Sequence, residues 1–245
     1  MSEQAKLHQN SQTLSLSFES SLIQSCMRLA DPDELVLDYT RAMMGFLLFN
    51  PAPRSVLMIG LGGGALHKYI HKHLPETDLT TVEINPGVIE LRQDFCIPSD
   101  DERSRIVCAD GADFLGRAAH QFDIILVDGF NAAGLPDALC SPGFYRRVKA
   151  ALAPLGLMVA NVQADTAQTR EIHKRVGRVF ERAMLSFESD EGGNDIVLAG
   201  QREAFVRCCQ AFDARWAALP PEHQVTLAAC STRLQRALLK GFGLK

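Results

Sequence analysis

The chain has 245 residues, 47% of them hydrophobic and 22% charged, which is enough to bury one large core. The formal net charge of −4 and the lack of any dense Lys/Arg run argue against a nucleic-acid partner. The N-terminal residues 1–12 lack the apolar stretch of a signal peptide, and no later apolar run approaches the roughly 18 residues of a membrane span. We therefore expect a cytoplasmic protein that does not enter a membrane.

The N-terminal segment predicts a small β-hairpin followed by a helix. Residues 13–18 alternate polar and apolar side chains, and residues 20–29 continue in the same style after a turn. Asp33 is placed to cap a helix that runs to about Phe49, and two prolines follow that helix at once. We expect residues 1–50 to form an extension that precedes the main domain.

From residue 55 onward, strands and helices alternate. We predict strands near 55–60, 79–84, 104–108, 122–128 and 155–162, with helices near 64–73, 86–93, 111–118, 142–152 and 166–182. Continuous apolar strands that alternate with helices predict a parallel sheet covered on both faces. Ligands of such sheets bind at the carboxyl edge of the strands.

The pattern changes after Arg182. Residues 183–188 and 195–199 predict two strands around a Gly-Gly turn, too close together for a crossover helix, so they should pair antiparallel. Residues 201–218 and 221–240 then predict two helices. The fold class is therefore α/β: a doubly wound, mostly parallel, seven-stranded sheet with an antiparallel last hairpin, as in S-adenosylmethionine-dependent methyltransferases. Residues 51–200 would form the nucleoside-binding catalytic domain, and residues 201–245 would pack on it.

Residues 56–66 read Val-Leu-Met-Ile-Gly-Leu-Gly-Gly-Gly-Ala-Leu, an apolar strand that runs into a glycine-rich turn. Gly60, Gly62, Gly63 and Gly64 let the backbone approach a ligand closely, and the following helix offers free amide donors. Glu83 lies about 20 residues further on, where an acid can hold ribose hydroxyls. Nicotinamide, flavin and S-adenosylmethionine sites all use such a turn, and a tight turn without a ligand has the same pattern.

Two more acids follow predicted strands. Asp110 and Gly111 come after residues 104–108, where a carboxylate can accept a hydrogen bond from an adenine amino group and glycine lets the ring lie flat. Asp128 ends the strand 122–128 at the same predicted edge. Asp110 could also be a helix cap, and Asp128 a turn residue. Together with Glu83, the set favours an S-adenosylmethionine-type site over a nicotinamide site.

Nothing in the sequence predicts a metal site. The seven cysteines form no C-x-x-C pair and no Cys/His cluster at zinc spacing. His67, His71 and His73 lie on or near the helix predicted over 64–73, but their spacing suits no metal or catalytic arrangement. We interpret all three as surface residues.

The chain resembles the spermidine synthase-like polyamine aminopropyltransferases from about residue 22 to residue 200. The resemblance rests on short motifs shared along the chain: Leu22-Ile-Gln24, Asp38-Tyr39, Ile59-Gly-Leu-Gly-Gly-Gly64, Thr81-Val-Glu-Ile-Asn85 with Val88-Ile89, Asp110-Gly111, Phe122-Asp-Ile-Ile-Leu-Val-Asp128, Gly134, Leu139 and Phe144-Tyr145. It implies a transferase that moves an aminopropyl group from decarboxylated S-adenosylmethionine to an amine. In the family this fold follows a small β-rich N-terminal domain and often forms oligomers, so the resemblance implies a homodimer.

Carried over residue by residue, the resemblance assigns roles at the predicted edge. Glu83 would bind the ribose, and Asp110 with Gly111 the adenine. Asp128 would be the catalytic base. Gln24 would face the nucleoside co-substrate, and the acceptor amine would be contacted by Tyr39, Asn131 and Tyr145. The two tyrosines could equally be core residues with a polar tip.

Three departures from the family pattern keep alternatives open. Gly63 stands where the family loop has an acid that binds the aminopropyl ammonium, and Asn131 replaces the second acid of the catalytic loop. The Tyr-Pro-x-Gly segment is replaced by Ser189-Asp-Glu-Gly-Gly-Asn194. A methyltransferase that uses intact S-adenosylmethionine, or a nucleoside-binding protein without turnover, therefore remains possible. An acidic pocket could be rebuilt from loop acids, or these could be solvated charges: Asp137, Glu188, Asp190 and Glu191.

Overall fold

The computed structural model describes residues 5–18, 23–117, 121–130 and 134–243. The N-terminal part forms a three-stranded antiparallel sheet of β1 (Lys6–Gln9), β2 (Thr13–Ser17) and β3 (Ile23–Arg28), in that order. The predicted hairpin corresponds to β2 and β3. Strand β1 was missed because all four of its residues are exposed, so its sequence shows no apolar face. Asn10 Oδ1 closes the β1–β2 turn by accepting hydrogen bonds from the amides of Gln12 and Thr13, both at 2.8 Å.

The predicted helix from Asp33 to Phe49 is shorter than expected. Helix α1 covers Asp38–Met43 and continues as the 3-10 helix η1 (Met44–Leu48). The prediction that Asp33 caps this helix was wrong, because its carboxylate pairs with the Lys72 ammonium at 2.7 Å. Residues 44–48 are all buried, so tertiary packing holds this last turn in place.

The main sheet has seven strands in the order β6-β5-β4-β7-β8-β10-β9. They are β4 (Ser55–Ile59), β5 (Asp78–Glu83), β6 (Ser104–Cys108), β7 (Phe122–Val127), β8 (Leu152–Gln163), β9 (Met184–Glu188) and β10 (Asn194–Gly200). Strands β4 to β8 are parallel, whereas β10 runs antiparallel to both β8 and β9. The predicted mostly parallel sheet with an antiparallel last hairpin is confirmed.

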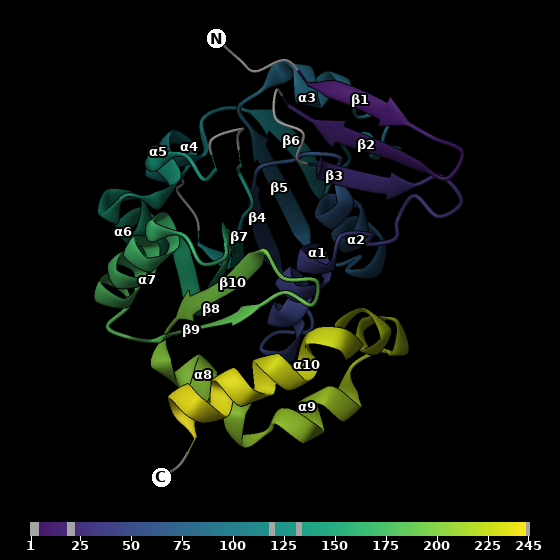
Figure 1. Ribbon diagram of the computed structural model, residues 1–245. Coiled ribbons are helices and arrows are strands. Elements are labelled where there is room, and N and C mark those ends of the chain that lie inside the picture. Colours follow the sequence, from purple (N-terminus) through teal and green to yellow (C-terminus); the bar gives the residue numbers. More distant parts are fainter. Residues whose placement is uncertain (1–4, 19–22, 118–120, 131–133, 244–245) are drawn as a thin grey trace.

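Helices cover both faces of this sheet (Figure 1). Side chains alternate between two cores: Val56 and Met58 of β4 point into one, and Leu57 and Ile59 into the other. The first core also takes in α1, η1, α2 (Ala65–His73) and the C-terminal helices. The second lies under α4 (Gly111–Arg117), α5 (Asp137–Cys140), α6 (Pro142–Ala151) and α7 (Ala167–Val179). A third, smaller core joins the N-terminal sheet to α3 (Pro86–Glu90).

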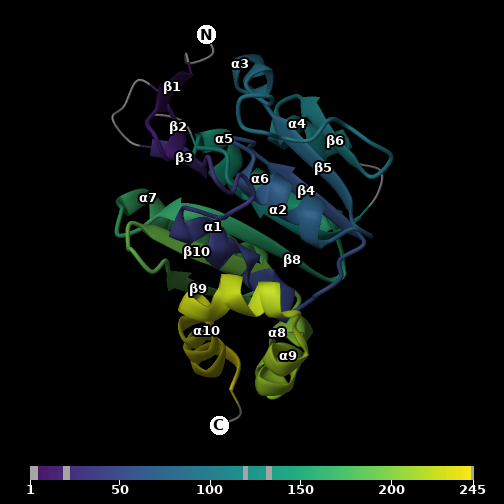
Figure 2. The same ribbon diagram turned by 90° about the vertical axis from the view of Figure 1, so that its right-hand side faces the viewer.

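The C-terminal segment forms α8 (Arg202–Gln210), α9 (Phe212–Ala218) and α10 (Pro221–Phe242). The single helix predicted over 201–218 is broken at Ala211. The guanidinium of Arg215 on α9 then donates to the carbonyls of Leu48 and Phe49, at 3.1 and 2.9 Å, which attaches α9 to the end of η1. The three-stranded sheet and the C-terminal helices lie at opposite ends of the molecule (Figure 2). Among the described residues, no helix combines the length and apolar character that crossing a bilayer requires.

Candidate active site

Adjacent strands of the main sheet bring polar residues to one edge. Parallel pairing puts the carboxyl ends of β6, β5, β4 and β7 side by side, and Asn161 of β8 follows Ala160, which pairs with Val127. Two backbone hydrogen bonds align the ends of neighbouring strands. Gly60 N donates to Val82 O, and Asp128 N donates to Ile59 O, both at 2.8 Å. Neighbouring strands are about 4.8 Å apart, so the chain at Glu83 and at Asp128 is separated by roughly 10 Å across β4. The predicted acids therefore share one edge.

The glycine-rich turn needs glycine for steric and conformational reasons. Gly60 has φ of +95°, and a Cβ there would lie 2.3 Å from the Asp128 carbonyl oxygen. Gly62 and Gly64 also have positive φ, 53° and 69°. The turn therefore passes against the strand end that carries Asp128, and it leads into α2 with Gly64 at the N-cap.

Gly63 lies in a confined space. A Cβ at this position would be 2.6 Å from Ser25 Oγ and 2.8 Å from the Phe95 ring. Because Ser25 belongs to β3, the N-terminal sheet packs directly over the turn. No side chain fits at this position unless Ser25 and Phe95 move. The packing of β3 and Phe95 over the turn therefore leaves no room for a side chain at residue 63.

The Glu83 carboxylate is buried and holds the turn in shape. Its Oε2 accepts from Leu61 N and its Oε1 from Asn85 N, both at 2.8 Å. A carboxylate oxygen can accept more than one hydrogen bond, so each keeps capacity for a ligand hydroxyl. Only 8% of Glu83 is exposed, which suits a residue that both shapes the loop and binds a ligand.

Asp110 caps α4, which was one of its two predicted interpretations. Its Oδ1 accepts from Ala112 N at 2.7 Å and from Asp113 N at 3.0 Å. Its Oδ2 accepts no hydrogen bond from the described residues, so that oxygen is free for a donor such as an exocyclic amine. A Cβ at Gly111 would lie 2.4 Å from Ile59, so glycine lets α4 pack closely on β4.

Asp128 has the most perturbed carboxylate of this edge. Burial raises its pKa to about 7, although hydrogen bonds from Asn161 and Tyr39 lower it. Asn161 Nδ2 donates to Asp128 Oδ1 at 2.9 Å. Near neutral pH such a group exchanges a proton readily, as a general base must.

Two asparagines behind Asp128 were not predicted from the sequence. Asn161 is buried, and its Oδ1 accepts from Asn194 Nδ2 of β10 at 2.9 Å. The amide of Asn161 is thereby fixed with its nitrogen toward Asp128. The sequence feature that points to Asn161 is that it is the single polar residue within the apolar run 157–162.

Tyr39 of α1 lies beside Asp128, and the backbone of Gln24 on β3 lies beside Tyr39. The Tyr39 hydroxyl oxygen is 3.4 Å from the Gln24 carbonyl oxygen, and burial together with the charge of Asp128 raises the Tyr39 pKa. The neighbouring Asp38 is buried and accepts from Tyr39 N at 2.8 Å and from Glu191 N at 2.6 Å. It therefore ties α1 to the loop between β9 and β10.

Of the other two predicted substrate contacts, only Tyr145 can be placed, and it lies in the second core. Tyr145 has no exposed surface, packs in the second core, and its hydroxyl has no hydrogen-bond partner among the described residues. Burial raises its pKa. It is a core residue because it faces inward from α6. Asn131 lies outside the described residues.

The loop acids do not gather into a new acidic pocket. Asp190 forms an ion pair with Arg233 of α10. Glu188 and Glu191 are exposed. Asp137 begins α5, and its side chain contacts the Cys140 thiol. Among the acids at this sheet edge, Asp128 is therefore the one best suited to accept and release a proton near neutral pH.

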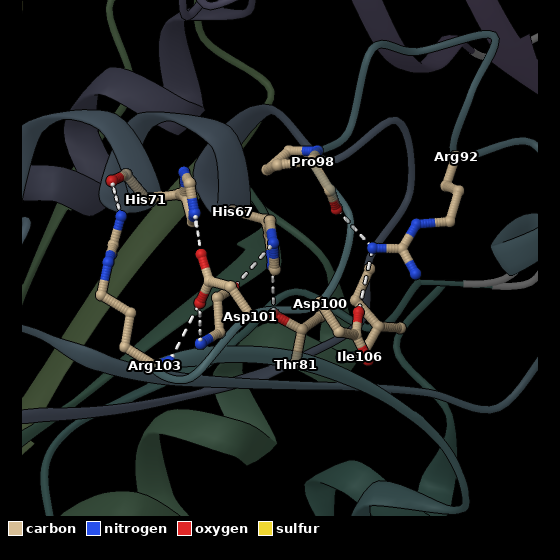
Figure 3. A network of polar contacts seen from close by, with 10 residues as sticks. His67, His71, Thr81, Arg92, Pro98, Asp100, Asp101, Arg103 and Ile106 are labelled. Atoms are coloured by element: carbon tan, nitrogen blue, oxygen red, sulfur yellow. Dashed lines mark hydrogen bonds and ion pairs between the residues drawn. The ribbon is translucent and has the colours of Figure 1, made fainter.

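The prediction that the histidines of α2 are surface residues was wrong for His67. His67 is 1% exposed; its Nδ1 lies 2.9 Å from Thr81 Oγ1 and its Nε2 3.3 Å from Ser104 Oγ. Burial lowers its pKa to about 4. His71 is half-buried and pairs with Asp101 at 2.8 Å, and His73 is also half-buried. Figure 3 shows the network that joins α2 to β5, β6 and the loop before β6.

No group of three His, Cys, Asp or Glu side chains within the described ranges could hold a metal ion.

This chain is similar to known proteins over most of its length. The family model for the spermine/spermidine synthase domain matches residues 30–188. Over 189 residues the chain is 40% identical to the polyamine aminopropyltransferase of Neisseria meningitidis serogroup A, which covers 76% of this chain and 72% of the relative.

Two solved structures have a similar fold. A probable spermidine synthase from Corynebacterium glutamicum matches with a TM-score of 0.67 and 21% identity, over 80% of this chain and 76% of that one. Human methyltransferase-like protein 13 in complex with SAH matches with a TM-score of 0.62 and 23% identity, over 85% and 96%. At these identities the two structures support the fold alone.

Proposed function

This chain belongs to the spermine/spermidine synthase family, and from that premise we propose that it transfers an aminopropyl group from decarboxylated S-adenosylmethionine to an amine acceptor. The observation that carries the proposal is the position and chemistry of Asp128. Its carboxylate lies at the same sheet edge as the glycine turn and Glu83, and its pKa of about 7 suits a general base.

The reaction needs an unprotonated amine. An alkyl amine has a pKa of about 10.4, so it arrives protonated and cannot attack. Asp128 attracts the cation, accepts a proton and orients the nitrogen lone pair. The nitrogen then attacks the carbon next to the sulfonium, the carbon–sulfur bond breaks with its electron pair going to sulfur, and neutral methylthioadenosine leaves. Asp128 later returns the proton to solvent. Positioning supplies the remaining rate enhancement, because the leaving group needs no further activation.

The nucleoside end of the site follows from the other strand ends. The remaining acceptor capacity of the Glu83 oxygens serves the ribose hydroxyls, and Asp110 Oδ2 accepts from the adenine amino group while Gly111 leaves room for the ring. Gln24 and Tyr39 close the site from the N-terminal side. In this proposal residues 51–200 form the catalytic domain, residues 1–50 cover the glycine turn, and residues 201–245 support the sheet.

The co-substrate is an S-adenosylmethionine-type sulfonium, and the acceptor is a small amine. Gly63 supplies no carboxylate for the ammonium of the aminopropyl group, and Asp128 serves the acceptor amine in this proposal. Asn131 would lie on the acceptor side. We further propose a cytoplasmic homodimer that binds neither nucleic acid nor membrane and needs no metal.

Replacing Asp128 with Asn separates catalysis from binding. Asp128→Asn keeps the shape of the side chain but removes the base, so we expect release of methylthioadenosine from decarboxylated S-adenosylmethionine and putrescine to fall by about 10²-fold or more. Affinity for methylthioadenosine, measured by calorimetry, should change by less than about threefold, because the nucleoside contacts lie on other strands.

The matched control is Asp94→Asn, an exposed acid outside the proposed site. It should keep wild-type turnover and binding. If Asp128→Asn retained wild-type turnover, the role of Asp128 as base would be refuted.

A further inference from the structure

The surface of α6 and α7 carries a concentration of positive charge that the transferase chemistry does not use. Residues 142–182 contain eight Lys or Arg and three Asp or Glu, a net charge of +5 in a chain whose formal net charge is −4. Figure 1 shows α6 and α7 side by side along one margin of the main sheet. Clustered cations repel one another, and a bound anion reduces that repulsion.

A groove between the two helices collects four of these cations. It has a volume of about 420 Å³ and is lined by Pro142, Arg146, Lys149, Arg175, Arg178 and Val179. No candidate active-site residue lines it. Small-molecule sites commonly have volumes of about 300 to 1,000 Å³, so this groove has the size of a site for a compact ligand.

Two of the four cations have no partner among the residues that the structure describes. Arg146 and Arg178 form neither an ion pair nor a side-chain hydrogen bond with any described residue. By contrast, Lys149 pairs with Glu181 at 2.8 Å, and Arg175 with Glu171 at 3.3 Å. The lining with its paired acids therefore has a net charge of about +2, which attracts anions with more than one charge.

Arg178 extends the positive surface into a second hollow. That hollow, of about 530 Å³, is lined by His173, Lys174, Gly177, Arg178, Arg182 and Met184. Arg178 thus separates two adjacent basic depressions. Guanidinium groups bind phosphate oxygens through two parallel hydrogen bonds. Arg146 lies on α6 and Arg178 on α7, and both line the groove. A ligand with two linked phosphate groups could therefore place one phosphate at each arginine.

We propose that the α6–α7 groove is a binding site for a small ligand that carries two or more phosphate groups. Arg146 and Arg178 bind the phosphates directly, and Lys149 and Arg175 contribute positive charge at the groove wall. The groove lining contains none of the candidate active-site residues, so the proposal does not depend on the proposed transferase reaction.

Calorimetry of the full chain with inorganic diphosphate, at constant ionic strength, tests the proposal. We expect saturable binding that weakens by about tenfold or more in the double variant Arg146→Ala/Arg178→Ala, because two charge-assisted contacts are lost. The variant Arg146→Lys/Arg178→Lys should retain part of the affinity, since it keeps the charge but not the planar fork. The control is Arg105→Ala/Arg236→Ala, two exposed arginines elsewhere, which should bind as wild type.

Three outcomes would overturn the proposal. Equal weakening in the control double variant would mean non-specific charge attraction. Tighter binding of citrate than of diphosphate, lost in the groove variant, would assign the site to polycarboxylates. Binding of a uridine oligonucleotide through Arg146 and Arg178 without any binding of diphosphate would make the surface a nucleic-acid contact.

Discussion

At the scale of single residues, the environment of Asp128 decides what the proposed site can do. An exposed aspartate is fully ionised and a weak base at neutral pH, whereas burial raises the Asp128 pKa to about 7. The hydrogen bond from Asn161 opposes this shift and keeps the carboxylate form accessible. Asn194 fixes the Asn161 amide in the orientation that donates. The two asparagines thus position and tune the proposed base.

Asn161→Ala should move the pH dependence of turnover. Loss of the donated hydrogen bond disfavours the carboxylate form, so the Asp128 pKa should rise above about 7 and the acidic limb of kcat/KM should move to higher pH by roughly one unit. Turnover should recover at higher pH, because the base itself is still present. The measurement is the pH profile of methylthioadenosine release.

Asn194→Ala provides a graded comparison, since it removes only the outer hydrogen bond of the pair. We expect a smaller shift in the same direction. A uniform loss of turnover at every pH, with the limb unmoved, would assign Asn161 a purely structural role.

The positions of the acids could be predicted from the sequence because strand ends in a parallel sheet meet at one edge. Glu83, Asp110 and Asp128 each follow a recognisable apolar strand. The asparagine pair could not be predicted, because its hydrogen bond depends on the register of β10 against β8. The two interpretations of Tyr145 could not be separated from the sequence, because only packing decides whether a tyrosine near a helix start faces inward, as Tyr145 does.

At the scale of elements, α2 is attached to the edge strands by a buried histidine. His67 bonds Thr81 of β5 and Ser104 of β6, and the nearby His71 pairs with Asp101 (Figure 3). Because the glycine turn leads into α2, this attachment also holds the turn in place. The spacing of the three histidines gave no sign of it, since burial depends on how α2 packs against the sheet.

His67 should make stability depend on pH. Its pKa is about 4 in the folded chain and about 6.5 when unfolded, so the unfolded state binds more protons between these values and stability falls as pH drops through this window. From pH 7 to pH 5 the loss should be about 2 kcal/mol.

Urea unfolding of the wild type and His67→Gln at the two pH values measures this contribution. The wild type should lose about 2 kcal/mol more between pH 7 and pH 5 than the variant does. The exposed His8→Gln serves as control and should follow the wild type. Identical pH dependence in the wild type and His67→Gln would show that His67 is not held neutral.

The order of the elements could largely be predicted, and the misses have a common cause. The strands of the main sheet are apolar runs buried on both sides, so they are visible in sequence. Strand β1 is exposed, α1 starts later than a capping residue suggested, and the helix over 201–218 breaks to place Arg215 on η1. Each miss depends on contacts with distant segments.

At the scale of the whole molecule, three cores support one catalytic edge from different directions. The first core fastens the C-terminal helices and α1 to the sheet, and the third holds the N-terminal sheet over the glycine turn. Because Tyr39 and Gln24 come from these covering elements, the proposed site requires both to be in place. The extra layers therefore position residues as well as adding buried area.

The measurement that tests the central claim most directly is a comparison of two co-substrates. The full chain is incubated with decarboxylated or intact S-adenosylmethionine and a panel of amines, and the products are identified by mass. We predict an aminopropylated amine and methylthioadenosine from the decarboxylated form alone. A methylated acceptor from the intact form, with none of the aminopropyl product, would contradict the account.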